Sequence, residues 1–209
     1  MAGWLMVGYV LLGSAVGTVL SIAAVRVYAS ERQSWLSGRT ASAVATAALF
    51  AELAWCFGAR AELVPYGILA AVCVPLAAVD LAEMRLPSSL VLPLYPILVS
   101  LFGAIAAIRH DAAGFLRAAG GCIAMGCFLL VLAVAYRGQL GAGDVKLGGV
   151  LGFAVGWVSW PAVWATAFLS AGLALLVQVS LRARRDRGDL AFGPFLIVGM
   201  FIALALASK

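Results

Sequence analysis

Two aspartates of this chain stand where apolar segments meet polar turns. Asp144 lies in the run Gly-Ala-Gly-Asp-Val-Lys-Leu at residues 141–147, which leads directly into an apolar stretch, and Asp80 ends an earlier apolar segment. An aspartate at the centre of a membrane-spanning helix costs about 3 kcal/mol on insertion scales, so an acid at or near that depth indicates a functional site. Asp80 and Asp144 are therefore the candidate functional pair.

A pair of carboxylates that share one site can perform acid and base chemistry together. At about 4 Å and an effective dielectric constant near 20, two negative charges repel by roughly 4 kcal/mol, so one carboxyl group stays protonated. The ionised partner can then take a proton from water while the neutral partner polarises a scissile carbonyl, as in aspartic proteases. The two aspartates thus predict peptide hydrolysis.

Other hydrolytic designs lack the residues that they need. The only histidine, His110, falls in a predicted loop on the side opposite the two acids, so the base of a serine or cysteine protease and the ligands of a catalytic zinc are missing there. We therefore expect no metal and no redox cofactor. The alternative structural role for the acids is to cap helix ends or to pair with Arg85 and Lys146.

The composition indicates what must position these acids. The chain of 209 residues is 65% hydrophobic and 11% charged, with a mean hydropathy of +1.09, which leaves too little polar surface for a soluble globule. A membrane crossing takes about 20 apolar residues. We predict an all-α polytopic bundle formed by residues 1–209 as a single domain, with eight spans centred near Leu12, Ala47, Leu69, Ile97, Met125, Leu151, Phe168 and Ile202.

The basic residues predict how the bundle is oriented. Of fourteen, ten fall in predicted loops one, three, five and seven, and only Arg60, Arg109, Arg117 and Lys209 lie on the other side. The positive-inside rule then places the odd loops, and with them Asp80 and Asp144, on the cytoplasmic face of the membrane, with both termini outside. Because the basic residues are scattered, we expect no nucleic-acid partner, whereas loop seven could attract anionic lipid.

Glycines and prolines near the acids have predicted roles as well. Gly141 and Gly143 permit positive φ and would let a substrate backbone approach without meeting a Cβ atom. Beyond them Gly148, Gly152 and Gly156 recur at every fourth residue, which favours close packing on a neighbouring helix. Two further prolines, Pro93 and Pro96, predict a bend in the fourth span, and Pro161 predicts the start of the seventh. The four cysteines lack metal-binding spacing and are expected to pack.

Four patches of the sequence together resemble the type IV prepilin peptidases, a family of GxGD-class membrane aspartic proteases. The run at 141–147 is similar to the family's GxGDxKL motif, and Asp80 followed by Leu86, Pro87 and Pro93 resembles its Asp-x5-Leu/Ile-Pro-Asp segment. Residues 191–196, Ala-Phe-Gly-Pro-Phe-Leu, resemble its PFGPFL run, and residues 17–26 resemble its GSFLNVVIYR stretch.

The resemblance implies removal of a short basic leader from pilin or pseudopilin precursors at the cytoplasmic face, with Asp80 and Asp144 as the catalytic pair. It makes Lys146, Phe192, Gly193 and Pro194 candidates for shaping the site or the substrate groove. Glu83, three residues after Asp80, is a candidate for meeting the positive charge of the leader.

The chain also departs from the family pattern. Full-length members carry paired cysteines in the loop after the first helix and often methylate the new N terminus, but loop one here is short and has no cysteine. Ser21 stands where the family usually has asparagine, so we do not expect methyltransferase activity. Ser88 replaces the acid that commonly follows Leu-Pro, and this replacement is expected to be tolerated.

Two other functions remain open at this stage. Paired membrane acids also relay protons, so a proton-coupled transporter using Asp80 and Asp144 as carriers is the alternative from a different class. A relative that degrades signal-peptide remnants is another, although the Lys146-Leu147 and Phe192–Phe195 patches favour the prepilin branch. The oligomeric state and the identity of the precursor do not follow from the sequence.

Overall fold

The computed structural model describes residues 3–28, 39–135, 140–183 and 191–208, and this part of the chain is helical with no strand. The helices, in order, are α1 (Gly3–Tyr28), α2 (Arg39–Phe57), α3 (Leu63–Glu83), α4 (Ser88–Val91), α5 (Leu94–Arg109), α6 (Ala112–Ala135), α7 (Ala142–Val158), α8 (Trp160–Ala183) and α9 (Gly193–Ala207). The predicted all-α class is confirmed.

Each of the eight predicted spans corresponds to a helical segment, with α4 and α5 together forming the fourth. Five segments are long and apolar enough to cross a bilayer: Val7–Ala24, Leu63–Glu83, Ser88–Arg109, Ala112–Ala135 and Trp160–Leu181. The apolar parts of α2 (Ala41–Phe57) and α9 (Gly193–Ala207) are shorter, and α7 has 17 residues. The chain is a multi-pass membrane protein.

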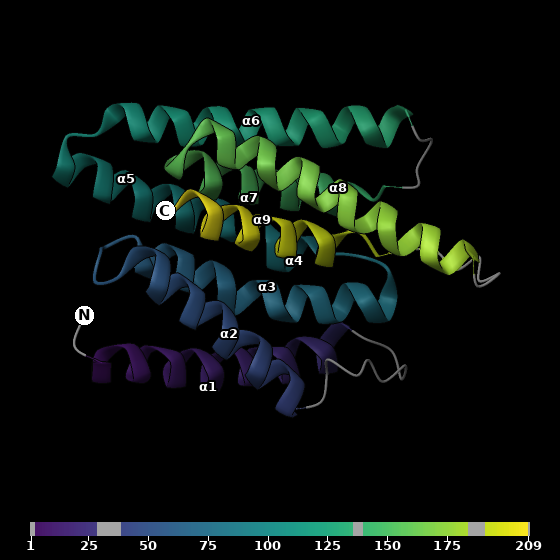
Figure 1. Cartoon of the computed structure of the whole chain (residues 1–209), viewed down its shortest axis with the longest axis horizontal. Coiled ribbons are helices and arrows are strands. Elements are labelled where there is room, and N and C mark those ends of the chain that lie inside the picture. Colours follow the sequence, from purple (N-terminus) through teal and green to yellow (C-terminus); the bar gives the residue numbers. More distant parts are fainter. Residues whose placement is uncertain (1–2, 29–38, 136–139, 184–190, 209) are drawn as a thin grey trace.

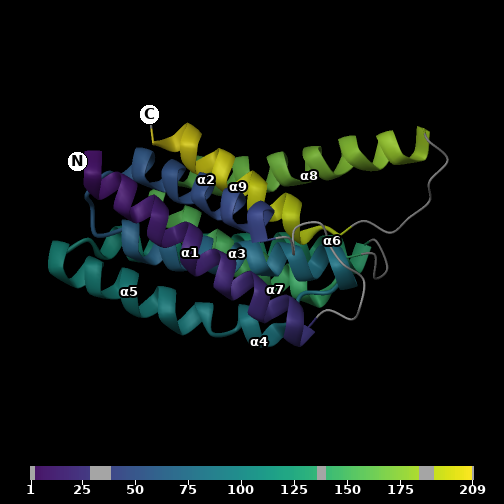
Figure 2. The ribbon, with the colours of Figure 1, turned by 90° about the horizontal axis from the view of Figure 1, so that it is seen from below.

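The helices run side by side along the long axis of the molecule (Figure 1). In Figure 1, helices α1 and α2 form one edge, α6 forms the opposite edge, and α3, α7 and α9 lie between them. The view from below (Figure 2) shows α4 and α5 on one side and α8 and α9 on the other. The core is correspondingly thickest around α3, α7 and α9, where Tyr66, Leu76, Leu151 and Leu196 are fully buried. These central helices are the ones that carry the candidate site residues.

The fourth predicted span is broken by proline, as expected. Helix α4 ends at Val91, and Pro93, which has no backbone N–H, precedes the first residue of α5. Pro96 lies in the first turn of α5, where backbone N–H groups have no intrahelical partner, so the missing N–H of proline costs no hydrogen bond. Pro161 is the second residue of α8, so it marks the start of that helix as predicted.

The glycine stripe of α7 packs against α6. A Cβ atom at Gly152 would lie 2.4 Å from the carbonyl oxygen of Gly121, and one at Gly156 would lie 2.9 Å from the carbonyl oxygen of Arg117. Backbone therefore meets backbone along this interface, which only glycine allows. The stripe fixes α7 on α6 from Gly148 onward.

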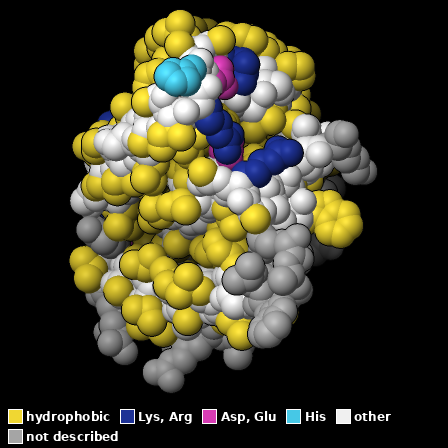
Figure 3. Space-filling view, turned by 90° about the vertical axis from the view of Figure 1, so that its left-hand side faces the viewer, with side chains coloured by type: hydrophobic (Ala, Val, Ile, Leu, Met, Phe, Trp, Pro, Cys, Tyr) yellow, Lys and Arg dark blue, Asp and Glu magenta, His cyan; other side chains and the backbone are white. Residues whose placement is uncertain are grey.

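Charged side chains gather at the end of the bundle where α5 turns into α6 (Figure 3). Arg109 forms an ion pair with the buried carboxylate of Glu62, in which Nη2 donates to Oε2 at 2.9 Å. Arg117 donates from Nε to the carbonyl oxygen of Gly156 at 2.9 Å and from Nη2 to that of Trp157, so it caps the last turn of α7. His110 follows Arg109 here, at the end of the molecule away from Asp80 and Asp144.

Six of the fourteen basic residues that predicted the membrane orientation fall outside the described residues. These are Arg32, Arg137, Arg184, Arg185, Arg187 and Lys209, and the same holds for most of loop one. Helix α1 begins and α9 ends toward the end of the bundle where α5 meets α6 (Figure 1). The two described chain ends therefore lie on one side, and the acids lie on the other.

The cysteines are four separate thiols. Cys73 is fully buried in α3, and Cys56 and Cys122 are partly buried, in agreement with a packing role. Cys127 is exposed on α6, so the packing interpretation does not extend to it.

Candidate active site

Asp80 lies in the last turn of α3 and is buried, with 4% of its surface exposed. The helix ends three residues later because Met84 adopts a left-handed conformation (φ 51°) and donates its N–H to the carbonyl oxygen of Asp80 at 2.8 Å. The carboxylate oxygen Oδ2 accepts a hydrogen bond from the backbone N–H of Gly193 at 3.0 Å. Asp80 is thus held at the N-terminal end of α9, where the helix dipole favours negative charge.

Asp144 lies in the first turn of α7 and is 8% exposed. Its Oδ2 accepts the N–H of Gly141 at 3.1 Å, whereas its Oδ1 is buried and has no hydrogen-bond partner among the described residues. Asp144 lies outside the five candidate spans. Burial raises its pKa to about 6 from an ordinary value of 3.8, and the bond from Gly141 opposes that rise. A buried oxygen without a partner is free to engage a reacting group.

The two acids are 64 positions apart in the chain, and Leu86 packs against the residues beside both of them. A Cβ atom at Gly143, next to Asp144, would lie 2.7 Å from Leu86 Cβ. A Cβ atom at Gly193 would lie 3.2 Å from Leu86 Cδ1 and 2.7 Å from Asp80 Oδ2. Leu86 therefore lies against the chain next to Asp144 and also beside the glycine whose N–H Asp80 accepts. The sequence placed them at the same end of the bundle, and the structure agrees.

The two glycines before Asp144 do not adopt the positive φ that glycine permits, whereas their role in the approach of a substrate stays a prediction. Gly141 has φ −72° and ψ 150°, an extended conformation open to any residue, and Gly143 lies within the helix and not among the residues of positive φ. The prediction of positive φ is therefore wrong, because α7 begins at Ala142. Glycine is required at 143 for the close approach of Leu86, and at Gly141 a Cβ atom would find its nearest contact only at 3.4 Å.

Lys146 is held from two sides by residues of α4 and α5. Its Nζ donates to Ser88 Oγ at 2.8 Å, and its carbonyl oxygen accepts from Tyr95 Oη at 2.8 Å. Lys146 therefore does not pair with Asp144, which was one form of the structural alternative. The other form, capping of helix ends, agrees with the backbone N–H groups of Gly141 and Gly193 that the two acids accept at the starts of α7 and α9. Sequence analysis did not identify Tyr95, because a tyrosine in an apolar helix gives no sign of its partner.

The remaining candidates border the same site. Glu83 is the last residue of α3 and half-buried, and Phe192 and Pro194 flank the N–H that Asp80 accepts. Phe192 packs on the buried core, and Pro194 lies in the first turn of α9, where its missing N–H costs no helical bond. The structure thus brings these residues, predicted from separate patches, around the two acids.

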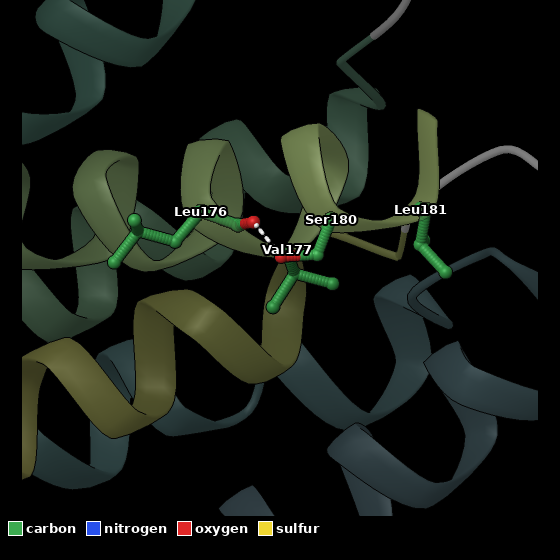
Figure 4. A pocket seen from close by; sticks show the side chains of 4 residues that line it. All are labelled: Leu176, Val177, Ser180 and Leu181. Atoms are coloured by element: carbon green, nitrogen blue, oxygen red, sulfur yellow. Dashed lines mark hydrogen bonds between the residues drawn. The ribbon is translucent and has the colours of Figure 1, made fainter. Parts of the chain in front are cut away.

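A separate shallow pocket lies on α8 and is lined by Leu176, Val177, Ser180 and Leu181 (Figure 4). Its single hydroxyl, Ser180 Oγ, donates to the carbonyl oxygen of Leu176 at 2.8 Å and offers no reactive group. Within the described part of the chain, no three His, Cys, Asp or Glu side chains gather as a metal site would require. The acid pair remains the candidate site.

Comparison with known proteins agrees with this site. The model of the type IV leader peptidase family matches residues 67–177, more than half of the chain and a range that includes Asp80 and Asp144. The match ends before Gly193, so the bond from α9 to Asp80 comes from outside the matched range. No solved structure matches the chain.

The chain is similar to several proteins named prepilin leader peptidase/N-methyltransferase. The chain is 29% identical over 163 residues to the Bacillus subtilis protein, covering 78% of this chain and 64% of the relative. It is 35% identical over 162 residues to the Burkholderia pseudomallei protein and 30% identical over 168 residues to the Pseudomonas aeruginosa protein, covering 75% and 77% of this chain and 50% and 56% of those relatives. The chain therefore spans about half to two thirds of the length of these relatives.

Proposed function

Because this chain belongs to the type IV leader peptidase family, we propose that it is an aspartic endopeptidase that removes the leader from type IV pilin-like precursors. The observation that carries the proposal is that two buried carboxylates lie together, Asp80 at the end of α3 and Asp144 at the start of α7. Each carboxylate accepts one backbone N–H, and Asp144 Oδ1 has no described partner. Groups that are buried, mutually repelling and incompletely satisfied are suited to acid and base catalysis.

The mechanism follows from the charge that the pair can hold. Repulsion and burial favour one proton shared by the two carboxyl groups, and the pair titrates as a unit. The ionised carboxylate takes a proton from the attacking water, whose oxygen adds to the scissile carbonyl carbon while the protonated carboxyl donates to the carbonyl oxygen. Collapse of the tetrahedral intermediate breaks the C–N bond, and the leaving amine receives a proton from the pair.

The substrate is a precursor with a short basic leader, cut on the cytoplasmic side of the inner membrane. In support, α3 and α7 present both acids at one end of the bundle, the end that the charge distribution assigned to the cytoplasm. Glu83 lies one helical turn beyond Asp80 and offers a negative charge to the leader. Lys146, Phe192, Gly193 and Pro194 shape the site around the acids.

The experiment that tests the function is co-expression of a leader-bearing pilin precursor with the wild-type chain, Asp80→Asn or Asp144→Asn. Each substitution removes ionisation with little change in volume, and immunoblots establish equal membrane levels. Processing by wild type alone supports the two-aspartate peptidase. Processing by both variants would refute the acid mechanism. If even wild type leaves several precursors uncut while the acids support proton-coupled uptake in vesicles, the transporter is the better description.

A further inference from the structure

Lys146 connects the helix that carries Asp144 to the segment that follows Asp80. Its side chain donates to Ser88 Oγ on α4, and its backbone oxygen accepts from Tyr95 Oη on α5, both at 2.8 Å. Helices α4 and α5 follow Asp80 after a single turn, at Met84 to Pro87. These two bonds therefore join the two parts of the chain from which the acids come.

The bond from Tyr95 depends on a glycine that the peptidase mechanism does not use. A Cβ atom at Gly149 would lie 2.3 Å from Tyr95 Oη, closer than the non-bonded contacts that Cβ atoms make in proteins, so the hydroxyl would have to move. Its next neighbours would be Tyr95 Cζ at 3.4 Å and Cys122 Sγ at 3.6 Å, both ordinary contacts. The surface of α7 is thus open at Gly149 for one atom in particular, the hydroxyl of Tyr95.

The position of these bonds on α7 is close enough to Asp144 to affect where its carboxylate lies. Asp144 lies in the first turn of the helix and Lys146 two residues later, so a shift of this turn would move the carboxylate. Farther along, α7 is fixed on α6 by its glycine stripe, but Gly148 is the first residue of that stripe. Before the stripe, the start of α7 contacts Leu86 through Gly143, and Ser88 and Tyr95 through Lys146.

We propose that Ser88 and Tyr95 are positioning residues, which hold the first turn of α7 on the α4–α5 segment so that Asp144 faces Asp80. The inference rests on the proposed peptidase function and adds two residues that touch neither acid. Their effect is exerted through Lys146. Loss of either bond moves Asp144 out of the geometry in which the pair shares a proton, and a displacement of about 1 Å can lower the rate 100-fold.

The first test compares Tyr95→Phe with Tyr66→Phe. Tyr66 Oη also donates to a carbonyl oxygen of α7, that of Ala154, at 2.7 Å, so both variants lose one hydroxyl bond to the same helix. We expect Tyr95→Phe to lower kcat for a leader-bearing precursor about tenfold or more with KM unchanged, and Tyr66→Phe to leave kcat within about twofold. Equal losses of kcat in the two variants would overturn the proposal.

A second readout needs no substrate. A water-soluble carbodiimide modifies the carboxyl group of Asp144 slowly while it is buried, and mass spectrometry of the labelled peptide gives the rate. We expect severalfold faster labelling in Tyr95→Phe and Ser88→Ala than in wild type, Ser88→Thr or Tyr66→Phe. Unchanged labelling in the first two variants would overturn the positioning role. If wild type cuts no precursor, the proposed function fails, and the labelling still decides the positioning.

A paired substitution tests the contact itself. Gly149→Ala alone forces the Tyr95 hydroxyl away, so it should lower kcat about as much as Tyr95→Phe does. In the Tyr95→Phe background the clash is gone, and adding Gly149→Ala should change kcat less than twofold. Multiplicative losses would show that Gly149 acts without Tyr95 and would count against the proposal.

Discussion

Gly193 and Asp80 lie 113 residues apart and are joined by a hydrogen bond of 3.0 Å from the Gly193 backbone N–H to Asp80 Oδ2. This bond holds the start of α9 against the end of α3, and so completes the packing around Asp80. It also leaves no room for a side chain at position 193, where a Cβ atom would lie 2.7 Å from that oxygen. The most C-terminal motif of the chain thus acts on the first aspartate.

Gly193→Ala should therefore damage the site while the bundle stays folded. The added methyl group pushes the Asp80 carboxylate away from Asp144, so we expect precursor processing to fall roughly 100-fold. Processing assays at matched membrane levels measure this. The control is Gly172→Ala, since a Cβ atom at this glycine of α8 meets nothing within 4 Å. Full activity of Gly193→Ala would contradict the role of this contact.

The two glycines of the Asp144 motif should differ in their tolerance of alanine. A Cβ atom at Gly143 would lie 2.7 Å from Leu86 Cβ and 3.1 Å from the Leu86 carbonyl oxygen, and neither atom can rotate away. At Gly141 the nearest contact, Asp144 Oδ2, would be at 3.4 Å. We expect Gly143→Ala to lower processing at least about tenfold and Gly141→Ala to retain most of it. Equal sensitivity in a side-by-side assay would mean that Leu86 does not set the spacing of the site.

Activity should fall on the acidic side near pH 6. Burial raises the pKa of Asp144 to about 6 from an ordinary value of 3.8, and because the two carboxyl groups titrate as a unit, the pair gains its second proton as the pH falls through about this value. The pair needs one ionised carboxylate, so kcat/KM should decline as the pH falls through about 6. A profile of kcat/KM between pH 4 and 9 measures this. A profile that is flat down to pH 4.5 would contradict the buried state of Asp144.

The opposite end of the bundle should control stability and not catalysis. Arg109→Ala leaves the buried Glu62 carboxylate without its ion-pair partner, and because Arg109 is itself 42% exposed we expect a loss of only about 1–3 kcal/mol. Thermal unfolding in detergent measures the loss, and adding Glu62→Gln should recover part of it because the charge is removed. Processing by the surviving folded protein should be unchanged. Unaltered stability of Arg109→Ala would show that the pair is dispensable.

The sequence alone determined the class of fold, the helical segments and the two acids. Apolar runs of membrane length leave the backbone no alternative to helices, because every N–H and carbonyl must be satisfied within the segment. Asp80 and Asp144 were recognisable because a charge beside such a run is costly unless it serves a function. The predicted bend at Pro93 likewise followed from a local property, the missing N–H of proline.

The tertiary structure decided which groups meet. That Gly193 donates to Asp80, that Gly143 makes room for Leu86 and that Tyr95 reaches Lys146 all depend on how helices pack across 51 to 113 residues of chain. The sequence suggested positive φ at Gly141 and Gly143, since glycine permits it, but α7 begins between them and needs no such conformation. Local preference restricts what each residue can do, and only long-range packing selects the contacts that place one carboxylate against the other.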